Sequence, residues 1–129
     1  MNMTLVFSAN QALLAAGAGA TYVSCFMGRL DDISVDSGQV VAEIVECFRA
    51  GGVTSQIIAA SVRHPEHVIA AAQLGCEIAT IPAKVLRQML EHPLTTAGAE
   101  RFRKDWESRP EFGDWLRDLV SKRAAATRG

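Results

Sequence analysis

Four short runs of apolar residues, each followed by a segment with helical character, are the feature that most constrains the fold of this chain. We expect strands at residues 4–7, 22–26, 56–60 and 76–81, each of them apolar on both faces. Strands of this kind belong to parallel sheets that are covered by helices. The sequence therefore predicts an α/β fold built from strand–helix units.

Helical patterns follow each expected strand. They lie at residues 11–18, 38–50, 65–73 and 83–91. Ser8 or Asn10 is expected to cap the first helix, and Asp36 or Ser37 the second. Four strand–helix units over residues 1–93 amount to half of a (β/α)8 TIM-type barrel, whose usual length is about 250 residues. We therefore expect a half barrel.

The composition changes after residue 93. Residues 94–123 combine many charges of both signs with aromatic side chains such as Phe102 and Trp106, which predicts two docking helices broken near Pro110. Residues 124–129 are expected to form a flexible tail. Because half a barrel leaves strand edges unpaired, we also expect the chain to associate with another chain.

The overall composition is that of a soluble globular domain. The 129 residues are 49% hydrophobic and carry a formal net charge of −1, which does not favour nucleic-acid binding. No apolar run is long enough to cross a membrane, and the first residues lack the charges of a signal peptide. Cys25, Cys47 and Cys76 are an odd number without C-x-x-C spacing, which favours reduced thiols in the cytoplasm over disulfides or zinc.

The segment YVSCFMGRLDD, residues 22–32, carries the first candidate site residues. Ser24 and Phe26 are two apart on a strand and share a face, and Arg29 follows the carboxyl end of that strand. Ligands of α/β proteins bind at this end. The pattern alone also fits an ordinary strand end with a surface arginine.

A second pattern of the same kind follows the next strand. Ser61 and Arg63 place a hydroxyl and a guanidinium two residues apart, directly after residues 56–60. Hydroxyl groups, an aromatic ring and guanidinium groups at neighbouring strand ends suit a phosphorylated, hydroxyl-rich small molecule. The two segments together predict a sugar-phosphate site.

Metal binding has weaker support. Asp31, Asp32 and Asp36 lack the spacing of an EF-hand, and we expect a salt bridge to an arginine or a helix cap from them instead. His64 and His67 are three apart, as in some metal sites, but no third ligand is evident nearby in the sequence. No metal is therefore predicted.

At this level of detail the motifs resemble those of the transaldolase family, which includes small fructose-6-phosphate aldolase-like members. NMTLVFSANQALLAAGAGATYVS, residues 2–24, resembles the fifth strand and helix of the family. FMGRLDD resembles its F-V-G-R-L/I-D segment, and IIAASVRHPEHV its A-A-S-x-R segment. CEIATIPAKVLRQMLEHPLT resembles the last strand and helix, and Asp105-Trp106 the closing D-W. The likeness is to the carboxyl-terminal half of the family.

The resemblance implies a (β/α)8 barrel in which a lysine forms a Schiff base with a ketose phosphate. A dihydroxyacetone unit then passes to an aldose phosphate, as in the pentose phosphate pathway, and no metal or organic cofactor is needed. It implies catalytic positions at Asn2 and at Thr4, which would hold the catalytic water. It implies substrate-binding roles for Ser24, Phe26, Arg29, Ser61 and Arg63, the last three gripping the sugar phosphate.

The chain departs from the family pattern at the groups that perform the chemistry. The Schiff-base lysine, the acid/base aspartate and the water-holding glutamate of the family would all precede Met1. The lysines present are Lys84, Lys104 and Lys122, and Lys84 is expected on the first turn of a helix at the surface. A Schiff-base amine needs a lowered pKa in a desolvated pocket. We therefore expect the chain to be inactive alone.

Three hypotheses follow. In the first, the chain is the phosphate-binding half of a transaldolase and becomes catalytic when joined to the half that carries the lysine. In the second, it is a non-catalytic sugar-phosphate-binding or scaffold module, and two copies close into a complete barrel as a homo-oligomer. In the third, it is a fragment with no task of its own.

Overall fold

The structure is a computed structural model that describes residues 1–126. A first compact unit spans Met1–Leu90, and a second begins at Glu91. None of the described helices is both long enough and apolar enough to span a lipid bilayer. The first unit contains all the described strands and is the part that positions the candidate site.

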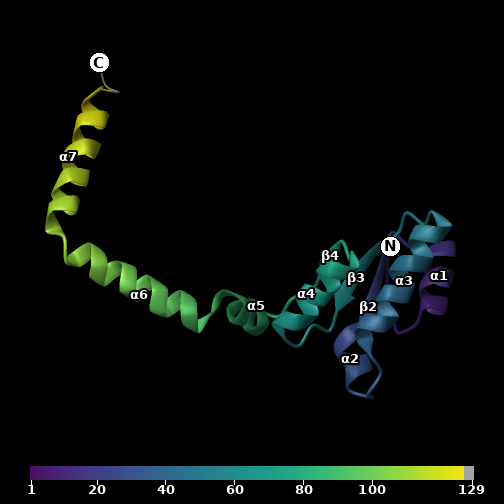
Figure 1. The fold of residues 1–129 in the computed structure, drawn as a ribbon. Coiled ribbons are helices and arrows are strands. Elements are labelled where there is room, and N and C mark those ends of the chain that lie inside the picture. Colours follow the sequence, from purple (N-terminus) through teal and green to yellow (C-terminus); the bar gives the residue numbers. More distant parts are fainter. Residues whose placement is uncertain (127–129) are drawn as a thin grey trace. The chain divides into compact units, whose positions relative to one another are not determined.

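The first unit is built on a parallel sheet with the strand order β1-β2-β3-β4 (Figure 1). The strands are β1 (Asn2–Val6), β2 (Tyr22–Phe26), β3 (Gln56–Ala60) and β4 (Ile78–Ala79). The helices are α1 (Ala9–Gly17), α2 (Met27–Asp31), α3 (Ser37–Gly51), α4 (Pro65–Leu74) and α5 (Ala83–Leu90). The chain thus contains consecutive βα units in sheet order, as in part of a (β/α) barrel, and the expected fold class is confirmed.

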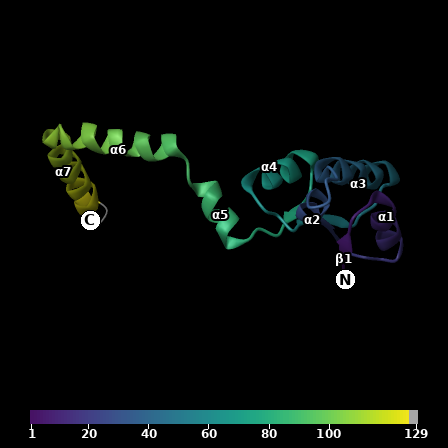
Figure 2. The same cartoon turned by 90° about the horizontal axis from the view of Figure 1, so that it is seen from below.

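Helices α1, α3 and α4 lie side by side along the sheet (Figure 2). Side chains on one face of the two central strands are buried in the core that these helices cover. They are Val23, Cys25, Ile57 and Ala59. Because strand side chains alternate, Ser24 and Phe26 point to the opposite face, which is the interior side in a closed barrel.

The helix caps follow the sequence. The Ser8 side chain accepts a hydrogen bond from the Gln11 N–H and caps α1, and the Asp36 side chain accepts one from the Gln39 N–H and caps α3. Gly75 ends α4 in the left-handed conformation, with φ 98°. One alternative in each expected pair of caps is therefore confirmed.

Several expected boundaries were wrong. No helix was expected between the strand at residues 22–26 and the helix at residues 38–50, but Met27–Asp31 form α2. β1 begins at Asn2 rather than Thr4, because Asn2 pairs with Tyr22 of β2. β4 is limited to Ile78–Ala79, the residues that pair with β3. Pairing with a neighbouring strand, rather than local composition, sets these strand ends.

The second unit contains two helices, α6 (Pro93–Glu107) and α7 (Pro110–Ala126), separated near Pro110 as expected. Both expose large apolar side chains, among them Phe102, Trp106 and Trp115. α7 includes the first residues of the expected tail, and residues 127–129 lie outside the described part of the chain.

Candidate functional site

The interior-side face of β1 and β2 carries a polar pair. The Ser24 hydroxyl donates a hydrogen bond to Asn2 Oδ1 at 2.9 Å. Ser24 is only 4% exposed, so this bond satisfies a buried hydroxyl and links the two strands. The amide nitrogen of Asn2 has no protein acceptor within the described residues, which leaves it able to donate to a ligand.

Thr4 lies two residues after Asn2 and is exposed. The pairing of β1 with β2 is irregular beyond Met3, because Val6 rather than Leu5 pairs with Cys25. Leu5 takes φ 56°, a left-handed conformation that costs a non-glycine residue about 1–3 kcal/mol. Strain of this kind is often found at functional sites, and here it directly follows Thr4, for which the family resemblance implies a role in holding the catalytic water.

Phe26 and Arg29 are in contact just past the end of β2. The Arg29 guanidinium lies over the Phe26 ring, with Cζ 5.7 Å from the centroid. Phe7 packs against the same ring edge-to-face at 6.0 Å between centroids. Arg29 is exposed and makes no ion pair within the described residues, so its N–H groups are available to an anion.

Arg63 reaches the same rim of the sheet from the segment after β3. The Gly28 N–H donates to the Ser61 carbonyl at 3.1 Å. A Cβ on Gly28 would lie 2.3 Å from that carbonyl oxygen and 2.7 Å from Arg63 Cγ and Nε. The backbone next to Arg29 therefore touches the Arg63 side chain, and the expectation that the two arginines share one rim is supported by direct contact.

The Arg63 guanidinium is paired. Its Nη2 lies 2.7 Å from Asp32 Oδ2, with both side chains about half exposed at 51% and 55%. The expected salt bridge from this acidic segment to an arginine is thus confirmed. A guanidinium has five N–H donors, so this one contact leaves others free for a phosphate oxygen.

Ser61 is half-buried and adopts φ 56°, the second strained residue at a strand end. Its carbonyl is occupied by Gly28, and its hydroxyl has no hydrogen-bond partner within residues 1–126. The hydroxyl is therefore free to bind a ligand between the two arginine-bearing segments.

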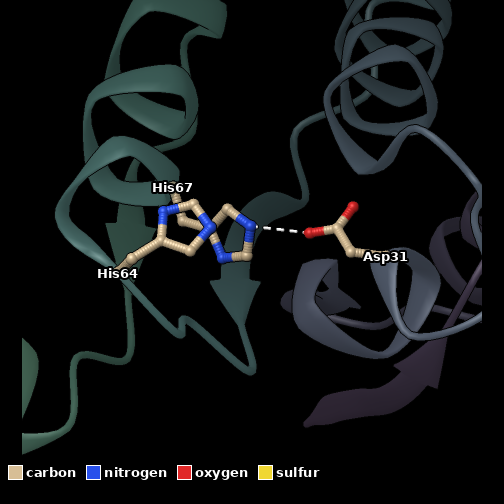
Figure 3. Close-up of side chains that lie close together, drawn as sticks. All are labelled: Asp31, His64 and His67. Atoms are coloured by element: carbon tan, nitrogen blue, oxygen red, sulfur yellow. Dashed lines mark hydrogen bonds and ion pairs between the residues drawn. The ribbon is translucent and has the colours of Figure 1, made fainter.

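Asp31, His64 and His67 form a cluster whose members come from the segments after β2 and β3 (Figure 3). His67 Nε2 is 2.6 Å from Asp31 Oδ2, and the His64 ring contacts the His67 ring in a tilted arrangement, with 3.8 Å between centroids and 45° between the ring planes. Burial alone would raise the pKa of Asp31, but hydrogen bonds from Ser37 and His67 outweigh it and lower the pKa. The third group near the histidines, not evident in the sequence, is thus supplied by the segment after β2.

The first unit, Met1–Leu90, contains a single lysine, Lys84. Lys84 is exposed on α5, as expected, and Lys104 and Lys122 are in the second unit. The polar side chains described above on the interior side are hydroxyls and an amide, none of which forms a Schiff base. The arrangement can bind and orient an anion-bearing polyol.

Comparison with known proteins is consistent with this geometry. The family model for transaldolase/fructose-6-phosphate aldolase matches residues 1–122. A probable transaldolase of Moorella thermoacetica is 68% identical over 106 residues, which are 82% of this chain and 49% of that protein. Probable transaldolases of Heliobacterium modesticaldum and Thermus thermophilus are 64% and 59% identical over 107 residues, 83% of this chain and 50% and 48% of theirs. The chain spans about half the length of these curated relatives.

Proposed function

Because the chain belongs to the transaldolase/fructose-6-phosphate aldolase family, we propose that it forms the phosphate-binding half of a sugar-phosphate site. In this proposal Arg29 and Arg63 bind the phosphate, and the Ser61 hydroxyl contributes a further hydrogen bond. Phe26 and Ser24 line the sugar, and Asn2 and Thr4 face the reacting carbonyl and its water.

The observation that carries the proposal is the contact between Gly28 and the segment of Ser61 and Arg63. It joins the segments that carry Arg29 and Arg63, which belong to two different βα units, and this supports a shared phosphate site. Guanidiniums bind phosphate through paired, charge-assisted hydrogen bonds, which are about twice as strong as neutral ones. The carboxyl ends of parallel strands are also where (β/α) barrels bind their ligands.

The catalytic step is proposed to need groups outside this chain. Class I aldol chemistry requires an amine whose pKa is lowered by burial, whereas Lys84 is an exposed helix residue. We propose that the missing βα units supply this amine and pair with β1. Beside β1 a cavity of about 320 Å³ is lined by Met3, Leu5, Leu14 and neighbouring residues, an apolar edge suited to such packing.

The test is binding of fructose 6-phosphate by isothermal titration calorimetry. Arg29→Ala and Arg63→Ala are each expected to weaken binding about tenfold or more, since a charged hydrogen bond contributes about 1.5–3 kcal/mol. Arg49→Ala, which removes an exposed arginine of α3, is the matched control and should bind as wild type does. Equal dissociation constants for all four proteins would refute the clamp.

The catalytic part of the proposal has a separate test. Borohydride reduction in the presence of fructose 6-phosphate traps a Schiff base as a stable covalent adduct. We expect no adduct on this chain alone, as judged by intact mass. An adduct that forms on the wild-type chain and disappears in Lys84→Arg would show that Lys84 is the nucleophile. It would contradict the proposal that the amine comes from outside this chain.

A second candidate function is a non-catalytic module in which two copies close one barrel. The exposed edge residues Met3 and Leu5 of β1 favour it, because an apolar strand edge tends to pair. Light scattering coupled to size exclusion separates the two. A dimer that Leu5→Lys converts to monomer would support this module, and a monomer at all concentrations would exclude it.

A further inference from the structure

We propose that His67 is a positioning residue for the phosphate clamp and holds Arg63 in place through its two ring nitrogens. The inference deepens the proposed function and rests on it. Its basis is a hydrogen-bonded chain that runs from Asp31 of α2 through His67 of α4 to the backbone of Arg63.

The chain of contacts is explicit. The Arg63 backbone N–H donates to His67 Nδ1 at 3.3 Å. His67 Nε2 lies 2.6 Å from Asp31 Oδ2, as the dashed line in Figure 3 marks, and Asp31 Oδ1 accepts the Ser37 N–H at 3.3 Å. One imidazole therefore joins the segments that carry Arg29 and Arg63.

These contacts determine the tautomer of His67. Nδ1 accepts a hydrogen bond from an N–H, so it carries no proton. The proton of the neutral ring is then on Nε2 and is donated to the Asp31 carboxylate. Asp31 thus selects the tautomer whose other nitrogen can hold the Arg63 backbone.

Burial makes the arrangement rigid. The His67 side chain is 8% exposed, whereas the Arg63 side chain is 51% exposed. The His64 ring lies against the His67 ring at a tilt of 45°. The half-exposed arginine therefore starts from a backbone position that a buried ring holds, which lowers the entropy lost when its guanidinium binds phosphate.

A divalent metal would suit this cluster less well. Ligands of a tetrahedral ion at about 2.0–2.1 Å lie more than 3 Å apart, whereas His67 Nε2 and Asp31 Oδ2 are 2.6 Å apart. A neutral imidazole bound to metal through Nε2 would also carry its proton on Nδ1, directed at the Arg63 N–H. The geometry favours a positioning hydrogen bond over coordination.

Two substitutions separate the two bonds of the ring. His67→Asn places an amide oxygen near the position of Nδ1 and retains an acceptor for the Arg63 N–H. His67→Gln extends an amide NH₂ toward the position of Nε2, so it retains the bond to Asp31 and loses the acceptor. The two variants have similar polarity and differ in which partner they keep.

The measurement is the affinity for fructose 6-phosphate and for inorganic phosphate by calorimetry. We expect His67→Gln to lose about threefold to tenfold in affinity, the worth of one hydrogen bond, and His67→Asn to stay within about twofold of wild type. Thermal unfolding of the same proteins gives the structural baseline. Equal affinity losses in both variants that follow their loss of stability would indicate a merely structural role and overturn the proposal.

The other outcomes are also decisive. If Arg63→Ala weakens phosphate binding but both His67 variants bind as wild type does, the positioning role is wrong while the proposed function stands. If Arg63→Ala has no effect, the proposed function itself fails. Nitrogen NMR should show His67 protonated at Nε2 alone, and a rise in unfolding temperature with Zn²⁺ that requires His67 would replace the proposal with a metal site.

Discussion

The backbone N–H of Gly28 donates a hydrogen bond to the carbonyl of Ser61 at 3.1 Å, which joins the segment after β2 to the segment after β3. The approach is so close that only a hydrogen atom fits on the α-carbon of Gly28. The side chain of Arg63 lies against the same atom. The segment that carries Arg29, the next residue along the chain, is thereby held against the segment that carries Arg63.

This contact predicts the effect of Gly28→Ala. The new Cβ would meet the Ser61 carbonyl at 2.3 Å and Arg63 Cγ at 2.7 Å, so backbone and side chain must both move. We expect a loss of about 1–3 kcal/mol in the free energy of unfolding, typical of overpacking, and weaker phosphate binding. Urea denaturation and calorimetry measure the two effects.

Gly17→Ala is the matched control. Gly17 is the last residue of α1, and a Cβ there has no neighbour within 4 Å. The same substitution should leave phosphate affinity unchanged and raise stability by up to about 1 kcal/mol, because alanine favours the helix. Similar destabilisation of both variants would contradict a specific role for the contact at Gly28.

Substitution of Asp32 is expected to strengthen phosphate binding, whereas Gly28→Ala is expected to weaken it. Its carboxylate occupies one N–H group of Arg63 and adds a negative charge where the phosphate is proposed to bind. We expect Asp32→Ala to raise phosphate affinity about threefold to fivefold, since an exposed ion pair contributes up to about 1 kcal/mol. The unfolding temperature should change little, and an affinity loss would show that Asp32 supports the arginine instead.

How far sequence patterns predicted the fold depended on whether the signal was local. β3 was predicted at its observed bounds, and α3 within one residue, because hydrophobic periodicity and flanking glycines define them. α2 was missed, since five residues are too few for a helical period. The bulge at Leu5 was missed too, because it arises from pairing with β2.

For the candidate site too, features with a local sequence signal could be predicted and those without one could not. Arg29 and Arg63 could be predicted because each follows an apolar strand, and parallel strands bring their carboxyl ends together. The pairing of His67 with Asp31 could not, because 36 residues separate them and neither has a distinctive local motif. The functional roles of all seven candidate residues, Asn2, Thr4, Ser24, Phe26, Arg29, Ser61 and Arg63, stay predictions.

The lowered pKa of Asp31 predicts a specific loss of stability in acid. Hydrogen bonds from Ser37 and His67 favour the carboxylate in the folded state, so the unfolded chain binds the proton more readily. The stabilisation is present above the unfolded pKa of about 3.9 and is lost as the pH falls through the lower folded pKa. Unfolding by urea, followed between pH 3 and 6, measures it.

Asp31→Asn should flatten this acid limb. An asparagine carries no titrating proton, so the free energy of unfolding of this variant should depend less on pH in that range. At pH 6 it should be lower than that of wild type, because the charged acceptor is lost. Asp105→Asn, at an exposed aspartate of α6 without a side-chain hydrogen bond in the described residues, should keep the wild-type profile. Parallel profiles for wild type and Asp31→Asn would contradict the assignment.

The cysteines make a prediction at the alkaline end. Burial raises the pKa of Cys25 to about 12 and that of Cys76 to about 11, in each case with a smaller contribution from a neighbouring ionisable group. Because the thiolate is the reactive form, we expect Cys25 to resist iodoacetamide at pH 8 in the folded protein and to react rapidly in urea. Peptide mass mapping after timed labelling measures both rates.

The same shift couples folding to pH. The folded state keeps the Cys25 thiol protonated. The contribution of this thiol to the free energy of unfolding is therefore fully present below the unfolded pKa of 9.0, and it is lost as the pH rises toward 12. The free energy of unfolding of the wild-type protein should therefore fall above pH 9. That of Cys25→Ala should fall less steeply over the same range. Cys25 is fully buried between β2 and the covering helices, so rapid labelling in the folded state at pH 8 would require this half barrel to open. That result would indicate that the helices covering β2 separate from the sheet at equilibrium.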